Sequence, residues 1–159
     1  MTLTDELCAA WNLEGSLDFL LMRFVVQTAS RAAGCWRLEN DHLRLVGFGW
    51  AEDMSPEISA GFQAATRRVP LDQVGLGIVK AAITAKPAIG RRDPQTTDLG
   101  GSATWIAKFG ANTSLAVPIR DAQTNGVVGV LAVSTAAFVT EKDFLWETLL
   151  QVSERISHG

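Results

Sequence analysis

The stretch SLAVPIRDAQTNGVVGVLAVST, from Ser114 to Thr135, decides the fold that the sequence predicts. Apolar residues lie on both sides of a polar segment that carries Asn125-Gly126, a dipeptide typical of tight hairpin turns. The stretch therefore predicts two antiparallel strands. Apart from weak hydroxyl groups and Asp121 in the turn, it holds no side chain that could act as a nucleophile or bind a metal. Strands specified this clearly, without reactive groups, indicate a scaffold.

Helices are predicted on both sides of the hairpin from apolar periodicity and capping residues. Ser16 is the expected N-cap of a helix that ends at Gly34, Ser55-Pro56 begins another, and Thr140 with Asp143 forms an acidic capping box for the last one. Within the hairpin, Pro118 is expected to mark a bulge or the end of regular pairing. The predicted helices span residues 4–12, 17–33, 56–65, 77–85, 104–109 and the segment after 140, and the other strands span 35–40, 43–50, 67–71 and 88–90.

This order of elements predicts an α+β fold around a mostly antiparallel sheet. We expect the first and last helices to share one face of the sheet. The middle helices and a long polar loop over 91–104 would then cover the other face, and a loop of that length is usually functional or mobile.

Composition excludes several classes of function. The 159 residues fit one domain, and the net charge of −3 argues against a nucleic acid or an anionic membrane as partner. No apolar run reaches membrane-spanning length, and the N-terminus lacks the basic start of a signal peptide, so a cytoplasmic protein is expected. The two cysteines, Cys8 and Cys35, are too few for a disulfide framework and are expected to be reduced and buried.

The usual signals of catalysis are missing, whereas the aromatic residues indicate a pocket. His42 and His158 are the only histidines, neither has a second metal ligand at a useful spacing, and no hydrolase or phosphate-binding motif occurs. Aromatic residues from the first two strands and from the short helix at 104–109 can border one face of the sheet, where they would form an apolar small-molecule site or plain core. They are Trp36, Phe48, Trp50, Trp105 and Phe109.

Four segments in order resemble a GAF domain, the regulatory sensor module of phosphodiesterases, phytochromes, histidine kinases and cyclase regulators. They are LDFLLMRFVVQTASRAAGCWRLEN, VPLDQVGLGIVKAAITAKPAI, the hairpin quoted above, and AAFVTEKDFLWETLLQVSERI. The resemblance covers nearly the whole chain. It implies a sheet of five or six strands, with terminal helices on one face and a ligand pocket under short helices and loops on the other.

The resemblance assigns the GAF domain to residues 16–159, preceded by a linker or short helix over 1–15. It implies a non-catalytic sensor that binds an unidentified small molecule without a covalent cofactor, forms a homodimer through its terminal helices, and belongs to a longer signalling protein with an output domain in the same polypeptide. That protein would be a histidine kinase, a response regulator or a cyclase-type regulator. The ligand would lie between the sheet and the 91–104 loop, and the predicted ligand-binding residues are Trp36, Phe48, Trp50, Leu76, Ile78, Trp105, Phe109, Ser114 and Ser134.

Departures from the family's motifs argue against several classes of ligand. No cysteine follows Cys35, which argues against covalent bilin attachment and against the mid-domain cysteines of free methionine-R-sulfoxide reductases. Neither histidine is placed as a haem ligand. Lys108-Phe109 and Asn112 only faintly echo the cyclic-nucleotide motif of phosphodiesterases. Two alternatives remain open at this point: a reductase of a small oxidised substrate that uses Cys35, and a dimerisation module whose core is filled.

Overall fold

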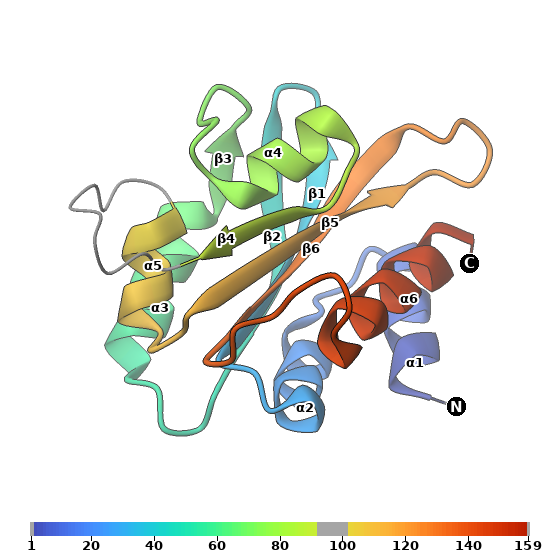
Figure 1. Ribbon diagram of the computed structural model, residues 1–159. Helices are drawn as coiled ribbons and strands as arrows, with labels where there is room; N and C mark the ends of the chain where they lie inside the picture. Colours follow the sequence, from blue (N-terminus) through green and yellow to red (C-terminus); the bar gives the residue numbers. More distant parts are fainter. Residues whose placement is uncertain (1, 92–101, 159) are drawn as a thin grey trace.

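The computed structural model describes residues 2–91 and 102–158. In this part of the chain, one sheet of six strands runs in the order β3-β2-β1-β6-β5-β4, and every neighbouring pair is antiparallel (Figure 1). The α+β prediction is confirmed. The strands are β1 (Ala32–Glu39), β2 (His42–Trp50), β3 (Arg68–Pro70), β4 (Ala88–Arg91), β5 (Thr113–Arg120) and β6 (Val127–Thr135).

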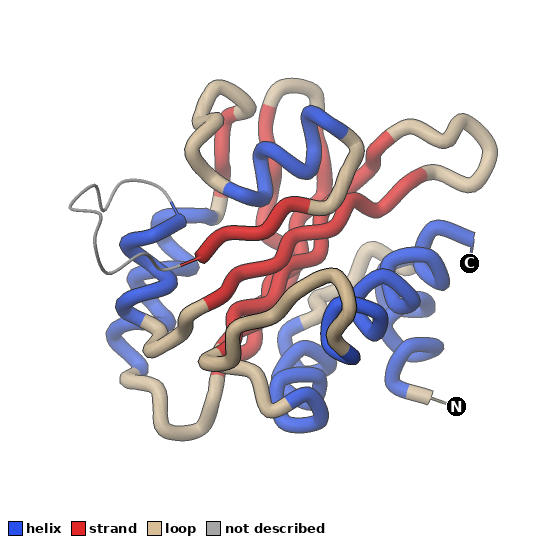
Figure 2. The backbone as a smooth tube through the Cα atoms, viewed as in Figure 1, coloured by secondary structure: helices blue, strands red, loops and turns tan. Residues whose placement is uncertain are grey.

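Helices cover the sheet on both faces, as Figure 2 shows. Apolar residues of the terminal helices form one core with Ala33, Cys35 and alternate residues of β5 and β6, and the middle helices cover the other face. The terminal helices are α1 (Leu3–Asn12), α2 (Asp18–Thr28) and α6 (Phe144–His158), and the middle helices are α3 (Pro56–Thr66), α4 (Gly77–Thr84) and α5 (Ser102–Lys108).

The β5–β6 hairpin is confirmed, and its turn is longer than a two-residue one. Asn125 has the left-handed φ of 59°, and the Asp121 carboxylate accepts hydrogen bonds from the backbone N–H groups of Gln123 and Thr124 at 2.8 and 3.0 Å. Pro118 pairs with β6 in regular register, but the pairing of β5 with β4 ends two residues earlier, at Ala116. The proline thus lies where β5 no longer needs a donor toward β4.

The predicted helix over 17–33 is too long. Helix α2 ends at Thr28, because Ala29 takes the left-handed conformation (φ 52°), and the chain from Ala32 on joins the sheet. Gly34, expected to end the helix, lies in β1 under the ring of Trp36. A Cβ at this glycine would lie 2.5 Å from the ring, so close packing explains the glycine.

The start of α6 also differs from the prediction. The Asp143 carboxylate accepts from the Thr140 backbone N–H, as a capping box would require, but residues 140–143 form a separate turn and the helix begins at Phe144. The backbone N–H of Glu147 donates to the Asp143 carbonyl, so Asp143 rather than Thr140 precedes the first helical residue.

The remaining helices lie within a few residues of their predicted positions. Residues 1–15 contain the short helix α1, which buries Leu3, Leu7 and Trp11 in the same core as α6. Of the long loop predicted over 91–104, Arg91 belongs to β4 and residues 102–104 to α5, while 92–101 lie outside the described residues.

Helix α2 protects the edge of the sheet where β3 stops. Strand β3 pairs only with residues 42–44 of β2. Beyond them, the backbone N–H of Leu17 donates to the Val46 carbonyl at 3.0 Å, and the Asp18 carboxylate accepts from the Phe48 N–H at 2.8 Å. These bonds satisfy backbone groups that an open strand edge would expose.

Candidate functional site

A cavity lies between the sheet and the three middle helices, on the face away from the terminal helices. Its floor consists of small residues on β1, β6 and β5, and its other walls come from β2, α3, α4 and α5. Eight of the nine predicted residues line it; that they bind a ligand stays a prediction. They are Trp36, Phe48, Leu76, Ile78, Trp105, Phe109, Ser114 and Ser134.

Trp50 is the exception, and its assignment to the cavity lining is wrong. Its ring stacks on Phe48 with the ring centroids 5.9 Å apart and the planes at 20°. Trp50 therefore packs behind a cavity residue instead of lining the cavity. Trp50 thus lies on the predicted face of β2, one layer behind the cavity lining.

Phe62 of α3 is the central aromatic residue of this wall, and the sequence analysis missed it. Its ring centroid lies 5.0 Å from Phe48, 5.2 Å from Trp105 and 5.1 Å from Phe109, and the last two contacts are edge-to-face. Such pairs add about 0.5–1.5 kcal/mol beyond the burial of area. Its presence as the only aromatic residue on the predicted helix over 56–65 was the signal available from sequence.

The polar groups of the cavity fall into two classes. Trp36 and Thr66 are satisfied, since the indole N–H donates to the Thr66 carbonyl at 3.0 Å and the Thr66 hydroxyl donates to the Phe62 carbonyl at 2.8 Å. Ser114 and Ser134 stand opposite each other on β5 and β6, and no described residue forms a hydrogen bond with either hydroxyl.

Ser134 is the buried member of the pair, with 8% of its surface exposed. Among the described residues, no fully enclosed side-chain oxygen or nitrogen lacks a partner. The unpartnered Ser134 hydroxyl must therefore keep some open surface, and the cavity that this residue lines provides it. No charged side chain of the described residues lines the cavity.

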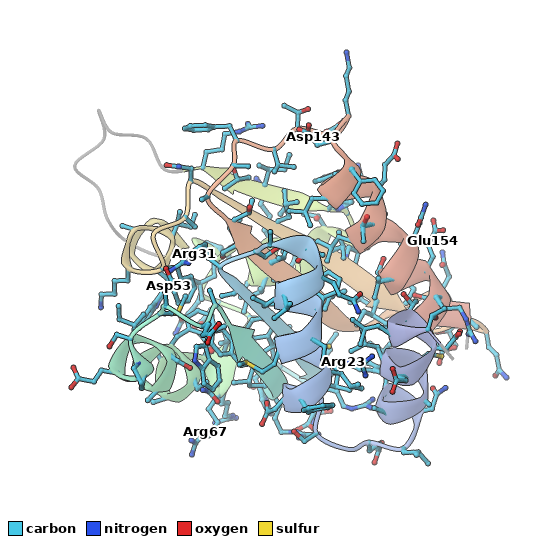
Figure 3. The ribbon with its side chains drawn as sticks, turned by 90° about the horizontal axis from the view of Figure 1, so that it is seen from below. Arg23, Arg31, Asp53, Arg67, Asp143 and Glu154 are labelled. Atoms are coloured by element: carbon cyan, nitrogen blue, oxygen red, sulfur yellow. The ribbon has the colours of Figure 1, made fainter. Side chains whose placement is uncertain are left out.

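Arg31 links Phe109, a cavity residue at the end of α5, to the loop after β2. Its Nε donates to the Phe109 carbonyl at 2.8 Å, and its Nη1 lies 2.6 Å from the Asp53 carboxylate in the loop after β2 (Figure 3). The bond to Arg31 lowers the pKa of Asp53 below its ordinary value. On the outer side, the Lys108 ammonium lies 4.5 Å from the centroid of the Trp105 ring.

No cysteine or histidine of the described residues lines this cavity. Cys35 points to the terminal helices, is fully buried, and has its pKa raised to about 12 by burial. Cys8 is buried beside Arg155 of α6. In residues 2–91 and 102–158, no group of three or more His, Cys, Asp or Glu side chains could hold a metal. Within the same ranges, every helix is too short or too polar to cross a bilayer.

No family model and no curated protein matches this sequence. Solved structures share its fold at low identity. The GAF domain region of a Geobacter sulfurreducens protein is 15% identical, with 88% of this chain and 89% of that one aligned and a TM-score of 0.62. The phycoerythrobilin-bound GAF domain of a cyanobacterial phytochrome is 10% identical, covering 98% and 90%, with a TM-score of 0.61.

An enzyme is also among the similar structures. The type II free methionine-R-sulfoxide reductase of Thermoplasma acidophilum is 13% identical, with 98% of this chain and 95% of that one aligned and a TM-score of 0.56. The same architecture thus carries both sensors and a reductase, and likeness of fold does not choose between them. The order of the strands, the two helical layers and these similarities establish that the chain has the fold of a GAF domain.

Proposed function

We propose that this chain is a non-catalytic GAF sensor domain that binds a small molecule in the aromatic cavity. The observation that carries the proposal is Ser134, a residue with 8% of its surface exposed, which lines the cavity and whose hydroxyl has no hydrogen-bond partner among the described residues. A buried polar group without a partner costs free energy, so such groups usually meet water or a ligand. Aromatic walls with a few polar groups are the ordinary form of a small-molecule site.

The placement of the cysteines supports a sensor over a reductase. A catalytic cysteine acts as a thiolate and must reach its substrate. Cys35 lies under the terminal helices on the opposite face of the sheet, and burial raises the pKa of its thiol to about 12. The sequence contains no cysteine between Trp36 and its end that could take this role.

The terminal helices are the proposed output of the sensor. Helices α1 and α6 lie side by side (Figure 1), and Arg155 of α6 contacts both Asp5, at 3.4 Å, and the Cys8 sulfur. Large apolar side chains of α2 and α6 face solvent, among them Phe19 and Phe144. These exposed groups support a homodimer through this layer. The resemblance to GAF domains is what supports an output domain in the same polypeptide, that of a two-component or cyclase-type cytoplasmic protein.

Strand β1 connects the cavity to the helical layer. Ala32, Gly34 and Trp36 line the cavity, while Ala33 and Cys35 belong to the core under the terminal helices. A shift of β1 on ligand binding would therefore change both faces together. The ligand can bias the two states only by its difference in affinity for them.

The test is mass spectrometry of small molecules released from the purified protein by denaturation. We expect a defined molecule from the wild-type chain and its loss from an Ala132→Leu variant, in which the larger side chain fills the cavity floor. A matched Ala10→Leu variant, on α1 and outside the cavity, should retain the molecule. Equal release from wild type and Ala132→Leu would exclude the cavity as the site. If no molecule is found and none added stabilises the fold, a dimerisation module with a filled core is the better description.

A further inference from the structure

We infer that the cavity selects a neutral, planar molecule about the size of one six-membered ring, with a single hydrogen-bonding group directed at Ser134 and Ser114. This inference rests on the proposed function and specifies its ligand class. Four properties of the cavity, as the described residues form it, support this ligand class: its volume, its uncharged lining, its shape and its two hydroxyl groups.

The volume sets the size. The space inside the cavity that is open to the centre of a water molecule is about 50 Å³. One water needs roughly 10–15 Å³ of such space, so the cavity would hold about three to five waters. A cavity of about 150 Å³ lined by apolar side chains binds benzene, so a single ring already requires these walls to widen and is the upper limit of size that we infer. A nucleotide or a tetrapyrrole would require the walls to open.

The charge of the ligand follows from the lining. No lysine, arginine, histidine, aspartate or glutamate of the described residues borders the cavity. Two cations of the described residues that contact Phe109 and Trp105 are committed elsewhere, since Arg31 binds the Phe109 carbonyl and Asp53, and Lys108 lies over the Trp105 ring. An ionised ligand would lose its hydration without gaining a counter-charge, which is strongly unfavourable.

The shape follows from the sheet. Ala32 pairs with Ser134, and Gly34 pairs with Ala132, so small residues face each other across β1 and β6. Ser114 extends this floor onto β5. The aromatic side chains of Phe62, Trp105 and Phe109 lie at the other walls. The Trp36 ring lies over Gly34, so this floor presents small side chains and one ring face, and with rings at the other walls it favours a planar aromatic ligand.

The position of the ligand's hydrogen-bonding group follows from which polar side chains of the lining already have a hydrogen-bond partner. The Trp36 indole and the Thr66 hydroxyl already donate to backbone carbonyls. Only Ser134 and Ser114, opposite each other in register, remain available among the described polar side chains of the lining. A hydroxyl both donates and accepts, so a phenol, an amide or a carbonyl on the ring would satisfy it.

The experiment uses two matched pairs of probes in titrations monitored by two-dimensional NMR of the isotopically labelled chain. Phenol and toluene have the same shape and differ in the hydroxyl group; benzamide and benzoate differ in charge at neutral pH. We expect binding of phenol and benzamide, with shifts at the amides of Ser134 and Ser114 and at the Trp36 indole. Benzoate should bind about 100-fold more weakly than benzamide, because no charged side chain of the described residues lines the cavity to offset the carboxylate.

The Ser134→Ala variant tests the hydrogen bond. The ratio of phenol affinity to toluene affinity should fall about 3- to 10-fold in this variant, the usual effect of one neutral hydrogen bond. Ser153→Ala is the matched control, because Ser153 is also buried but lies on α6 at the opposite face of the sheet. It should leave the ratio unchanged.

The outcomes separate the two proposals. If benzoate binds as tightly as benzamide, or if the ratio is the same in Ser134→Ala as in wild type, the ligand class is wrong. If no probe binds while a charged or larger molecule is released from the purified protein and competes at the cavity, the ligand class fails and the sensor proposal stands. If no probe binds and no molecule is released, both proposals fail.

Discussion

Replacing Gly49 by alanine should force helix α2 away from the sheet. A Cβ at Gly49 would lie 2.4 Å from the carbonyl carbon of Leu21 and 2.5 Å from its oxygen. Ordinary contacts begin at 3.4 Å, so the helix backbone would have to move by about 1 Å, and no side-chain rotation can relieve a contact between a strand and a helix backbone.

The size of the effect can be estimated from the interactions that this movement disturbs. Overpacking a core costs about 1–3 kcal/mol. The same shift lengthens the 2.8 Å bond from the Phe48 N–H to the Asp18 carboxylate, and bonds to charged groups contribute about 1.5–3 kcal/mol. We therefore expect a loss of about 3–5 kcal/mol, which for a chain of this size lowers Tm by about 10 °C.

Urea unfolding followed by circular dichroism provides the assay, and Gly75→Ala provides the control. Nothing lies within 4 Å of a Cβ at Gly75, so that variant should match or slightly exceed wild-type stability. A Gly49→Ala variant within about 1 kcal/mol of wild type, with an unchanged unfolding slope, would refute the close approach of α2 to β2.

Three further predictions concern the site and the charges. Arg31→Ala should destabilise the fold by about 1–2 kcal/mol and speed hydrogen exchange of the backbone at Phe109 to Ala111, because it removes the link between Phe109 and the loop after β2; Arg67→Ala, an exposed control, should change neither. Cys35 should resist iodoacetamide in the native protein at pH 8 and react after unfolding, since burial raises the pKa of its thiol to about 12; rapid native alkylation would contradict the buried placement. The pKa of Asp53 is lowered by the bond to Arg31 and that of Asp121 by the Thr124 and Gln123 amides, so their contribution to stability is present above about pH 4 and is lost as the pH falls through the lowered values; a Tm that stays constant from pH 6 to pH 2.5 would contradict it.

The hairpin could be predicted because alternation fixes which side of a strand is buried, whereas most of the cavity lining was implied by the resemblance to GAF domains. On β2 the alternation is imperfect in the sequence, and the structure supplies the reason. The register with β1 shifts at this point, Gly47 pairing with Cys35 and Leu45 with Trp36, which leaves Val46 as an extra residue. This bulge lets Leu45 and Phe48 face the same side of the sheet although they are three residues apart.

Phe62 and the boundary between α2 and β1 could not be predicted for a different reason. Both depend on contacts between elements distant in sequence: Phe62 becomes central only because α3 places it between Phe48 and Trp105. In the sequence, Gly34 looks like a glycine that ends a helix. In the structure it lies within β1, where the ring of Trp36 leaves no room for a Cβ. Local preference favoured the longer helix, and tertiary packing decided otherwise.

The size of the cavity limits how strongly a ligand could switch this domain. A molecule of about seven heavy atoms has a binding free energy of at most about 10 kcal/mol, at the ceiling for very small ligands. Converting a population from 1:99 to 99:1 requires a difference in affinity of about 5.5 kcal/mol between the two states. For a ring-sized ligand, more than half of the largest attainable binding free energy would have to come from contacts that exist in only one of the two states. A cavity of this size would therefore suit a domain whose two states are already close in free energy, where a ligand preference of about 1–2 kcal/mol, the contribution of one hydrogen bond to Ser134, would shift the terminal helices proposed as the output by a graded amount.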